Sequence, residues 1–175
     1  MRRLSRALAW EASRTRPVVE YPVQTPVADT VGHRPAKTSI IVPVLRAGLF
    51  MSDGVCDVLE GAGVACIGMS RNEATLEAQA YLAAVPENMA GCHVVVCDPM
   101  LATGGSLVAV GDILEAHGAE EVTALVICAA PEGIARLEAR FPDWTLHVAA
   151  IDDHLNDRGY IVPGLGDAGD RLCGL

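Results

Sequence analysis

The fold of this chain is decided by the stretch Val94-Val95-Val96-Cys97-Asp98-Pro99-Met100-Leu101-Ala102-Thr103-Gly104-Gly105-Ser106. Its apolar start is typical of a strand buried on both faces, and an acid, a turn of small residues and a helix start follow it. The two glycines let the backbone approach a phosphate closely, while the Thr103 and Ser106 hydroxyls can donate hydrogen bonds. We therefore expect an anion-binding turn, with Asp98 at the carboxyl end of its strand, where open α/β sheets bind ligands.

This turn matches neither of two common phosphate-binding motifs. The Gly-Lys-Ser/Thr element of a P-loop is missing, and so is the G-x-G-x-x-G fingerprint of dinucleotide-binding folds. The plainer interpretation is an ordinary strand-to-helix turn in which Thr or Ser caps the helix, and a bare T-G-G would favour it. The whole pattern, from the apolar run to the hydroxyls, favours the anion site instead.

Apolar strands alternate with helices on both sides of this stretch. Such alternation predicts a parallel sheet covered by helices on both faces. The expected strands are residues 39–45, 64–69, 93–97, 121–129 and 145–150, and the expected helices are residues 49–59, 105–117 and 131–140. The sequence therefore predicts an α/β fold around a central, mostly parallel, five-stranded sheet.

We expect one domain over residues 1–175, with an N-terminal helix and arm at 1–37, the core at 38–150 and a C-terminal tail at 151–175. The tail is rich in Gly and Asp and shows no helical period.

Within the arm, apolar residues at helical spacing predict a short helix over 3–14, and three prolines favour an edge ribbon at 18–23. Residues 28–37 are expected to form a loop. Residues 70–88 are polar and longer than most loops in compact domains, which indicates a functional flap.

Composition excludes several classes of protein. The chain has a net charge of −9, with 51% apolar and 20% charged residues, so it is globular, and its charge opposes nucleic acid and anionic membranes as general partners. No apolar run approaches the roughly 20 residues that cross a bilayer. The six cysteines include no C-x-x-C pair, and the chain's start lacks a signal-peptide pattern, so we expect a cytoplasmic protein with reduced cysteines.

The segment from Asp98 to Ser106 resembles the phosphoribosyl-diphosphate (PRPP) binding motif of type I phosphoribosyltransferases, and its wording D-P-M-L-A-T-G-G-S is similar to that of the uracil phosphoribosyltransferase family. Three further segments agree in order and spacing. They resemble the family's diphosphate loop (Val42-Pro43-Val44-Leu45-Arg46-Ala47-Gly48-Leu49), its flexible flap (Arg71-Asn72-Glu73-Ala74-Thr75-Leu76) and its uracil hood (Gly159-Tyr160-Ile161-Val162-Pro163-Gly164-Leu165-Gly166-Asp167-Ala168-Gly169-Asp170-Arg171). The resemblance implies the type I phosphoribosyltransferase fold, with a small C-terminal hood and an N-terminal arm.

The resemblance also implies a reaction, in which N1 of uracil displaces diphosphate from C1 of PRPP and gives UMP, as in pyrimidine salvage. Arg46 and Arg71 are expected to hold the diphosphate, and Asp98 to lie near the ribose hydroxyls. The expected catalytic residues are Asp98, Asp167 and Arg71. PRPP binding is expected to involve Arg46, Arg71, Asp98, Pro99, Met100, Leu101, Ala102, Thr103, Gly104, Gly105, Ser106 and Asp167. Mg²⁺ is expected to arrive on PRPP, without a direct protein ligand.

The uracil site is expected in the hood. Backbone groups of Ile161, Gly166 and Ala168 would read the base edge, Tyr160 would pack beside the sugar or base, and Asp167 would act on PRPP, its Mg²⁺ shell or the base. The resemblance further implies a homodimer or higher homo-oligomer. It leaves control by a nucleotide effector such as GTP open.

Some residues depart from the family pattern. Ser70, Ala78 and Ala84 stand in the flap where Tyr, Pro and Lys are usual, Phe50 and Cys173 replace Gly and Phe, and relatives carry an additional N-terminal helical arm. These departures keep a second interpretation open, namely a non-catalytic sensor that binds PRPP or UMP. A transferase for purines or orotate is disfavoured by the hood, and an RNA-binding regulator by the net charge.

One pair of carboxylates lies just before the hood. Asp152 and Asp153 could be mistaken for a metal or acid–base pair, and we interpret them instead as solvated loop residues.

Overall fold

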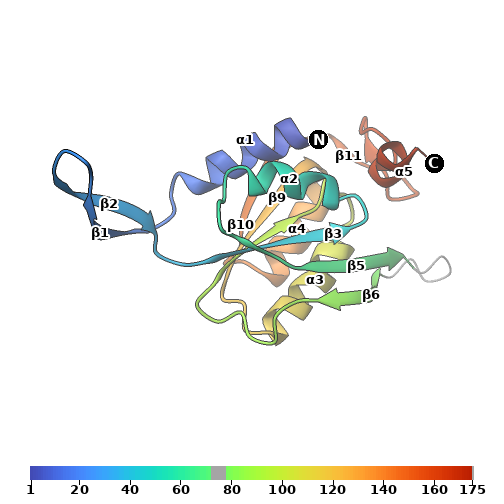
Figure 1. Ribbon diagram of the computed structural model, residues 1–175. Coiled ribbons are helices and arrows are strands. Elements are labelled where there is room, and N and C mark those ends of the chain that lie inside the picture. Colours follow the sequence, from blue (N-terminus) through green and yellow to red (C-terminus); the bar gives the residue numbers. More distant parts are fainter. Residues whose placement is uncertain (72–77, 175) are drawn as a thin grey trace.

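The computed structural model describes residues 1–71 and 78–174, and these form a central sheet with helices on both faces (Figure 1). The main path of the sheet runs β10–β9–β7–β3–β5–β6. Its strands are β3 (Ser39–Leu45), β5 (Cys66–Arg71), β6 (Ala78–Ala84), β7 (His93–Cys97), β9 (Glu121–Ala129) and β10 (Thr145–Ile151), with the short β4 (Gly63–Val64) and β8 (Met100–Leu101) paired to β3 and β9.

The five predicted strands are confirmed as parallel neighbours, β10, β9, β7, β3 and β5. The predicted irregular segment 70–88 is wrong in part, because β5 continues to Arg71 and pairs antiparallel with β6, which spans Ala78–Ala84. Ala78–Ala84 is mostly exposed, and its pairing with β5 rather than an apolar pattern of its own makes it a strand. The residues of the predicted flap from 72 to 77 lie outside the described part of the chain.

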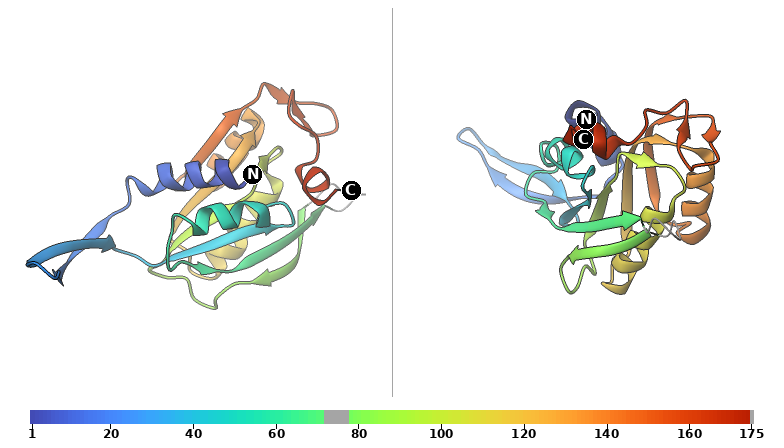
Figure 2. Two further views of the ribbon diagram at one scale, coloured as in Figure 1. Left: turned by 45° about the horizontal axis from the view of Figure 1, so that its top comes forward. Right: turned by 90° about the vertical axis from the view of Figure 1, so that its right-hand side faces the viewer.

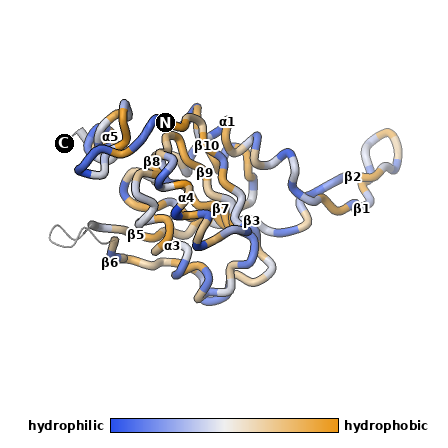
Figure 3. Tube along the Cα trace, turned by 180° about the vertical axis from the view of Figure 1, so that it is seen from behind, coloured by the Kyte–Doolittle hydropathy of each residue, from blue (hydrophilic) through white to orange (hydrophobic). Residues whose placement is uncertain are grey.

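Two helices cover each face of the sheet, as the views in Figures 1 and 2 show. α1 (Arg2–Ser13) and α2 (Leu49–Cys56) share a buried apolar cluster with Ile41, Val95 and Leu125. On the other face, α3 (Gly105–Ala116) and α4 (Pro131–Arg140) pack on Val42, Val94 and Val96. Neighbouring residues of a strand point to opposite faces, so strands buried on both sides need continuous apolar runs. Figure 3 shows this apolar character through the middle of the sheet.

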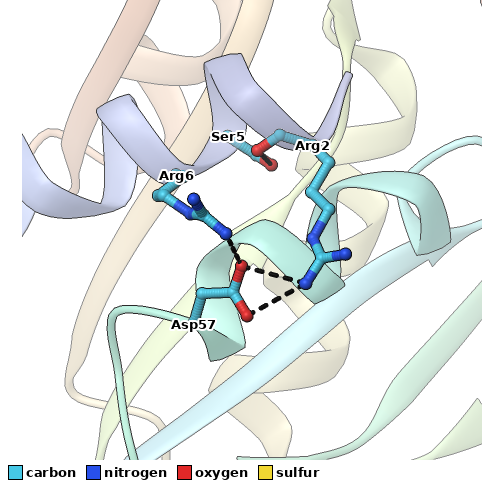
Figure 4. A network of polar contacts seen from close by, with 4 residues as sticks. All are labelled: Arg2, Ser5, Arg6 and Asp57. Atoms are coloured by element: carbon cyan, nitrogen blue, oxygen red, sulfur yellow. Dashed lines mark hydrogen bonds and ion pairs between the residues drawn. The ribbon is translucent and has the colours of Figure 1, made fainter.

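The N-terminal helix α1 docks on α2 through one close contact and one ion-pair cluster. A Cβ at Gly54 would lie 2.3 Å from the Ser5 Oγ, so only glycine lets the two helices approach this closely. Beside that contact Asp57 pairs with Arg2, at 3.1 Å, and with Arg6 (Figure 4). The two guanidinium groups lower the pKa of the Asp57 carboxyl.

The arm is a two-stranded antiparallel ribbon that projects from the body (Figure 1). Its strands are β1 (Val18–Gln24) and β2 (Asp29–Pro35). The predicted ribbon at 18–23 is confirmed, and the predicted loop over 28–37 is wrong, because Asp29–Pro35 pairs with β1 along its length. Only the antiparallel partner reveals this strand, since Gly32 and Pro35 do not favour one on their own.

The tail contains a small ribbon, β11 (His154–Leu155) with β12 (Ile161–Val162), and a short helix, α5 (Ala168–Cys173). The sequence showed no helical period here, and α5 was missed because six residues are too few to carry one. The tail and the ends of β5 and β6 lie at one end of the molecule, opposite the arm (Figure 1). Among the described helices, none is long and apolar enough to cross a membrane.

Candidate active site

The order of the strands predicts where a ligand would bind. From β3 the chain crosses through α2 to β5 on one side, and it later returns to β7 on the other side of β3. The loops that follow β3 and β7 therefore diverge at the carboxyl edge of the sheet, which is where open α/β sheets bind ligands. Arg46 follows β3, and Asp98 follows β7.

The turn after β7 has the geometry of an anion cradle. Gly104 has a φ of +76° and is the residue before α3, whose first amide groups have no partner within the helix. A Cβ at Gly104 would lie 2.9 Å from the carbonyl oxygen of Gly133, so α4 supports the turn from behind. The turn lines a cavity of about 360 Å³ together with the hood. The helix N-terminus favours a negative group in that cavity.

Asp98 lies where this cavity meets a neighbouring one, and it lines both. Its Oδ1 accepts a hydrogen bond from the Met100 backbone N–H at 3.3 Å, which fixes the carboxylate at the start of the turn. Burial raises the pKa of Asp98 to about 7, and the hydrogen bond from Met100 opposes part of that rise. Removing the charge from water disfavours the ionised form, so the carboxyl exchanges its proton near neutral pH.

The loop after β3 forms the second cavity, of about 470 Å³. Arg46 is exposed and lines this cavity, and the peptide bond before it is cis. Gly48 is the residue before α2, and a Cβ there would lie 2.2 Å from the carbonyl oxygen of Cys97. The lack of a side chain at this position thus brings the Arg46 loop against the end of β7, next to Asp98.

The hood closes the first cavity from the other side. Ile161 is buried against Cys128 and Ala130, while Tyr160 is 46% exposed and lines the cavity beside it. Asp167 caps α5, because its Oδ1 accepts a hydrogen bond from the Asp170 N–H at 2.9 Å. Asp167 and Ala168 line both cavities, so the hood borders the cavity of the anion-binding turn and the cavity of Arg46.

The structure brings nearly all the predicted site residues to this place. The first cavity is lined by Asp98, Met100, Leu101, Ala102, Thr103, Gly104, Gly105, Ser106, Tyr160, Ile161, Gly166, Asp167 and Ala168, and the second adds Arg46 and Pro99. Arg71 is the last residue of β5 and lies opposite Ala78 of β6. Its side chain is outside the described part of the chain. The following residues of the predicted flap, Asn72 to Leu76, also lie outside the described part of the chain.

Three further residues contact the anion-binding turn or the tail, and sequence reasoning assigned none of them to the site. Arg136 of α4 donates a hydrogen bond from Nη1 to the Thr103 carbonyl oxygen at 3.4 Å, which brings a cation to the anion-binding turn. Glu132 accepts a hydrogen bond from the Leu155 N–H, and Asp152 accepts one from the Gly164 N–H, both at 2.9 Å. The prediction that Asp152 is a solvated loop carboxylate is therefore wrong, whereas Asp153 is exposed. These contacts span at least 12 residues, so no local signal reveals them.

A larger cavity, of about 1330 Å³, lies elsewhere, between α1, the arm and the start of β3. Several basic side chains line this cavity, and three of them already contact other groups of the chain. Arg6 pairs with Asp57, Lys37 pairs with Glu121 at 2.7 Å, and Arg16 donates to the Lys37 carbonyl oxygen. The anion-binding turn does not line this cavity. We therefore assign the chemistry to the two smaller, adjoining cavities.

Comparison with known proteins agrees with this assignment. The family model described as uracil phosphoribosyltransferase matches residues 1–174. A uracil phosphoribosyltransferase of Streptococcus pyogenes is 48% identical, with 95% of this chain and 80% of that protein covered. One from Chlamydia muridarum is 44% identical over 99% of this chain, which spans 58% of that protein's length.

Solved structures agree on the fold. A protein from Aquifex aeolicus is 40% identical and has a TM-score of 0.88, covering 96% of this chain and 81% of that one. A purine phosphoribosyltransferase from Pyrococcus horikoshii is 17% identical with a TM-score of 0.59, covering 86% and 85% of the two chains. At that identity the second likeness shows the fold alone, that of type I phosphoribosyltransferases.

Proposed function

The chain belongs to the uracil phosphoribosyltransferase family, and on that premise we propose that it transfers the phosphoribosyl group of PRPP to uracil, giving UMP and diphosphate. The bond from C1 to the diphosphate oxygen breaks, a bond from C1 to N1 of uracil forms, and the N1 proton leaves to solvent. The reaction returns free uracil to the nucleotide pool. The single observation that carries the proposal is that the PRPP motif and the hood enclose one cavity.

The anion-binding turn suits the 5-phosphate of PRPP. The first amides of α3 and the hydroxyls of Thr103 and Ser106 surround a space that a Cβ at Gly104 would distort. Backbone donors at a helix N-terminus bind phosphate without the cost of burying a cation. This arrangement lets a chain of net charge −9 bind a polyphosphate.

The second cavity suits the diphosphate. Arg46 lines it, and a guanidinium group can donate two parallel hydrogen bonds to phosphate oxygens. We propose that Arg46 holds the leaving diphosphate together with Arg71, the last residue of β5. Charge grows on the diphosphate as the bond to C1 breaks, so a fixed cation there stabilises the transition state more than the ground state.

Asp98 lines both cavities and so lies between the two proposed phosphate positions, where the ribose would sit. A carboxylate accepts hydrogen bonds from sugar hydroxyls and favours positive charge that develops at C1 in an oxocarbenium-like transition state. We propose this role for Asp98. Its pKa of about 7 implies that the ionised form becomes predominant only as the pH rises above neutrality, unless the ligand lowers that pKa.

Uracil would bind in the hood, next to Tyr160. The base presents alternating carbonyl and N–H groups, which backbone groups of Ile161, Gly166 and Ala168 can complement. Ile161 is buried and the turn beyond it is tight, so these groups are held in place before the base arrives. Preorganised donors and acceptors of this kind discriminate between bases that differ in one exocyclic group.

Mg²⁺ is part of the proposal. The donor set fits it, because Asp98 and Asp167 are carboxylates that line both cavities and Mg²⁺ prefers oxygen ligands from one or two carboxylates and substrate phosphates. We propose that the ion arrives on PRPP rather than on a site of the chain's own. Bound there, Mg²⁺ would neutralise charge on the diphosphate.

The comparisons lend no support to the alternative of a non-catalytic sensor. We also propose a cytoplasmic location, which suits cysteines that are free in the described structure, and a homo-oligomer, which suits the exposed arm. A GTP effector is an expectation that titration of GTP into the assay would test.

The test is a panel of bases offered to the purified chain with PRPP and Mg²⁺. We expect uracil to give UMP, while hypoxanthine, guanine and orotate give no nucleotide. Chromatography of the products measures both results in one experiment. Turnover of a purine with uracil unused would overturn the proposal and leave only the fold-level assignment.

A further inference from the structure

Asp152 lies at a junction between the sheet and the hood. It follows β10 directly, and its backbone N–H donates to the Ala129 carbonyl oxygen at the end of β9, at 2.9 Å. Its Oδ2 accepts one hydrogen bond from the Gly164 N–H at 2.9 Å and another from the Cys128 thiol at 3.2 Å. Asp152 thus contacts the end of β9 through its main chain and its carboxylate, and the same carboxylate also contacts the hood.

The hood end of this junction is a tight turn. Gly164 has a φ of +54°, and a Cβ there would lie 2.2 Å from the Ile161 carbonyl oxygen. Gly164 therefore packs directly against the main chain of Ile161, one of the proposed base-reading residues. Gly164 is also two residues from Gly166, which is another. The Asp152 carboxylate thus holds a turn that contacts the base-reading backbone.

The sheet end of the junction is fixed by Cys128. This residue is 6% exposed and shares a buried cluster with Ala130 and Ile161. Burial and the neighbouring carboxylate raise the pKa of the Cys128 thiol to about 11, so the sulfur keeps its proton at neutral pH and donates it to Asp152. The thiol is then a structural hydrogen-bond donor rather than a nucleophile.

Other links between the body and the hood use different groups. The Asp153 N–H donates to the Val162 carbonyl oxygen, and Glu132 accepts from the Leu155 N–H, so both hold the small ribbon. Among the described contacts, the Asp152 side chain is the one that reaches the turn beyond the ribbon.

We propose that Asp152 is a positioning residue for base recognition, which holds the Gly164 turn against the end of β9 so that the backbone of the hood meets uracil in a fixed geometry. The inference rests on the proposed function, and it adds a residue that does not itself line the cavity. Removing the carboxylate leaves the Gly164 N–H and the Cys128 thiol without their acceptor and frees the turn. The anion-binding turn and Arg46 are untouched, so PRPP binding stays intact.

The experiment compares Asp152→Ala with the matched control Asp153→Ala, which removes an exposed carboxylate from the adjacent residue. We expect Asp152→Ala to raise the KM for uracil by about 10-fold, the effect of losing a hydrogen bond to a charged acceptor. The KM for PRPP is expected to stay within about 2-fold of the wild-type value, and Asp153→Ala to leave both constants unchanged. Equal increases in the two KM values, or the same increase in the control, would overturn the proposal.

Asp152→Asn and thermal unfolding distinguish a local effect at the hood from a general loss of structure. The amide keeps one oxygen acceptor in the same place, so this variant should recover part of the uracil affinity while remaining folded. If Asp152→Asn is folded and binds uracil no better than a folded Asp152→Ala, an oxygen at this position has no positioning role and the proposal is wrong.

A binding measurement separates this proposal from the proposed reaction. Calorimetry with UMP and with ribose 5-phosphate needs no turnover. We expect Asp152→Ala to weaken UMP binding and to leave ribose 5-phosphate binding unchanged, because only UMP carries the base. This difference would stand even if the wild-type chain formed no UMP, in which case the reaction would be wrong and the positioning role would survive. Equal weakening of both ligands would contradict the positioning role.

Discussion

At Asp98, burial opposes the charge that the proposed reaction requires. The carboxyl lies at the end of a fully buried strand, and the one described hydrogen bond to it comes from the Met100 N–H. Burial therefore raises the pKa to about 7 from the value of 3.8 for a free side chain. The ionised Asp98 that the proposed reaction requires therefore lowers the free energy of unfolding, as is common for functional carboxylates.

The pH dependence of stability tests this cost. A raised folded-state pKa means that the contribution of Asp98 is full below about pH 4 and is lost as the pH rises to about 7. We expect Asp98→Asn to exceed the wild type in free energy of unfolding by about 1–3 kcal/mol at pH 8, and by less at pH 5.

Denaturant titration of both proteins at the two pH values measures this difference. His93 acts in the other direction, because burial lowers its pKa to about 4 and its contribution is lost as the pH falls from 6.5. Both proteins carry His93, so its effect cancels in the comparison. A difference that does not grow with pH would show that the Asp98 carboxyl is not destabilised by burial.

Arg136 gives a second prediction at the scale of one residue. Its guanidinium lies beside the anion-binding turn, so Arg136→Ala should raise the KM for PRPP by about 2- to 5-fold, as expected for an exposed charge. The increase should shrink in high salt, which screens exposed charges. Arg140→Ala is the matched control, because it removes the same charge from the same helix, where Arg140 pairs with Asp112 and Glu115. Equal effects of the two variants would contradict a local role for Arg136.

The site residues were predictable where they lie in one continuous segment of the sequence. The segment from Asp98 to Ser106 carries its strand, acid, glycines and helix start in consecutive positions. Arg136 and Asp152 were not predictable, because their partners lie 33 and 12 residues away and arginine or aspartate on a surface element is ordinary. Asp167 was expected at the ligand, and the structure adds that it also caps α5.

At the scale of one element, the turn before α3 requires glycine for two reasons. Gly104 has a positive φ, and a Cβ there would meet the Gly133 carbonyl oxygen. We expect Gly104→Ala to lower stability by about 1–2 kcal/mol through backbone strain and to weaken PRPP binding by about 10-fold or more by displacing the turn. Calorimetry with PRPP and thermal unfolding measure the two effects.

Gly61 provides a matched control for that substitution. It has a φ of +75°, and a Cβ there would meet nothing within 4 Å. Gly61→Ala should therefore carry the backbone strain alone, with unchanged PRPP binding. If both variants bind PRPP equally well, contact of the turn with α4 does not shape the site.

The elements that the sequence predicted well carry strong local signals. β7, β9 and α4 appear at the expected residues, because continuous apolar runs and a helix that starts with proline leave little choice. β2 and β6 were missed because each is mostly exposed and depends on an antiparallel neighbour. A strand held by its partner rather than by its own apolar face leaves a weak pattern in the sequence.

At the scale of the whole molecule, the arm is exposed in a way that a single chain does not explain. Val18, Tyr21 and Val31 are 58%, 41% and 54% exposed, and an isolated two-stranded ribbon is marginally stable in water. A second copy of the chain would cover these side chains. We expect light scattering to give at least twice the 18.4 kDa mass of one chain.

Val31→Asp is expected to reduce that mass, because a charge would enter the covered surface. Circular dichroism should show that the variant keeps the helices of the body. An 18.4 kDa species in the wild type would contradict the proposed assembly.

The central claim is that the two adjoining cavities catalyse transfer of the phosphoribosyl group to uracil. It is tested most directly by following UMP and diphosphate formation from PRPP and labelled uracil, with the wild type and Arg46→Ala side by side. We predict equal amounts of the two products, and a loss of about 100-fold or more in kcat/KM for Arg46→Ala. A folded wild-type chain that binds PRPP and forms no UMP, or equal rates in the two proteins, would contradict the account.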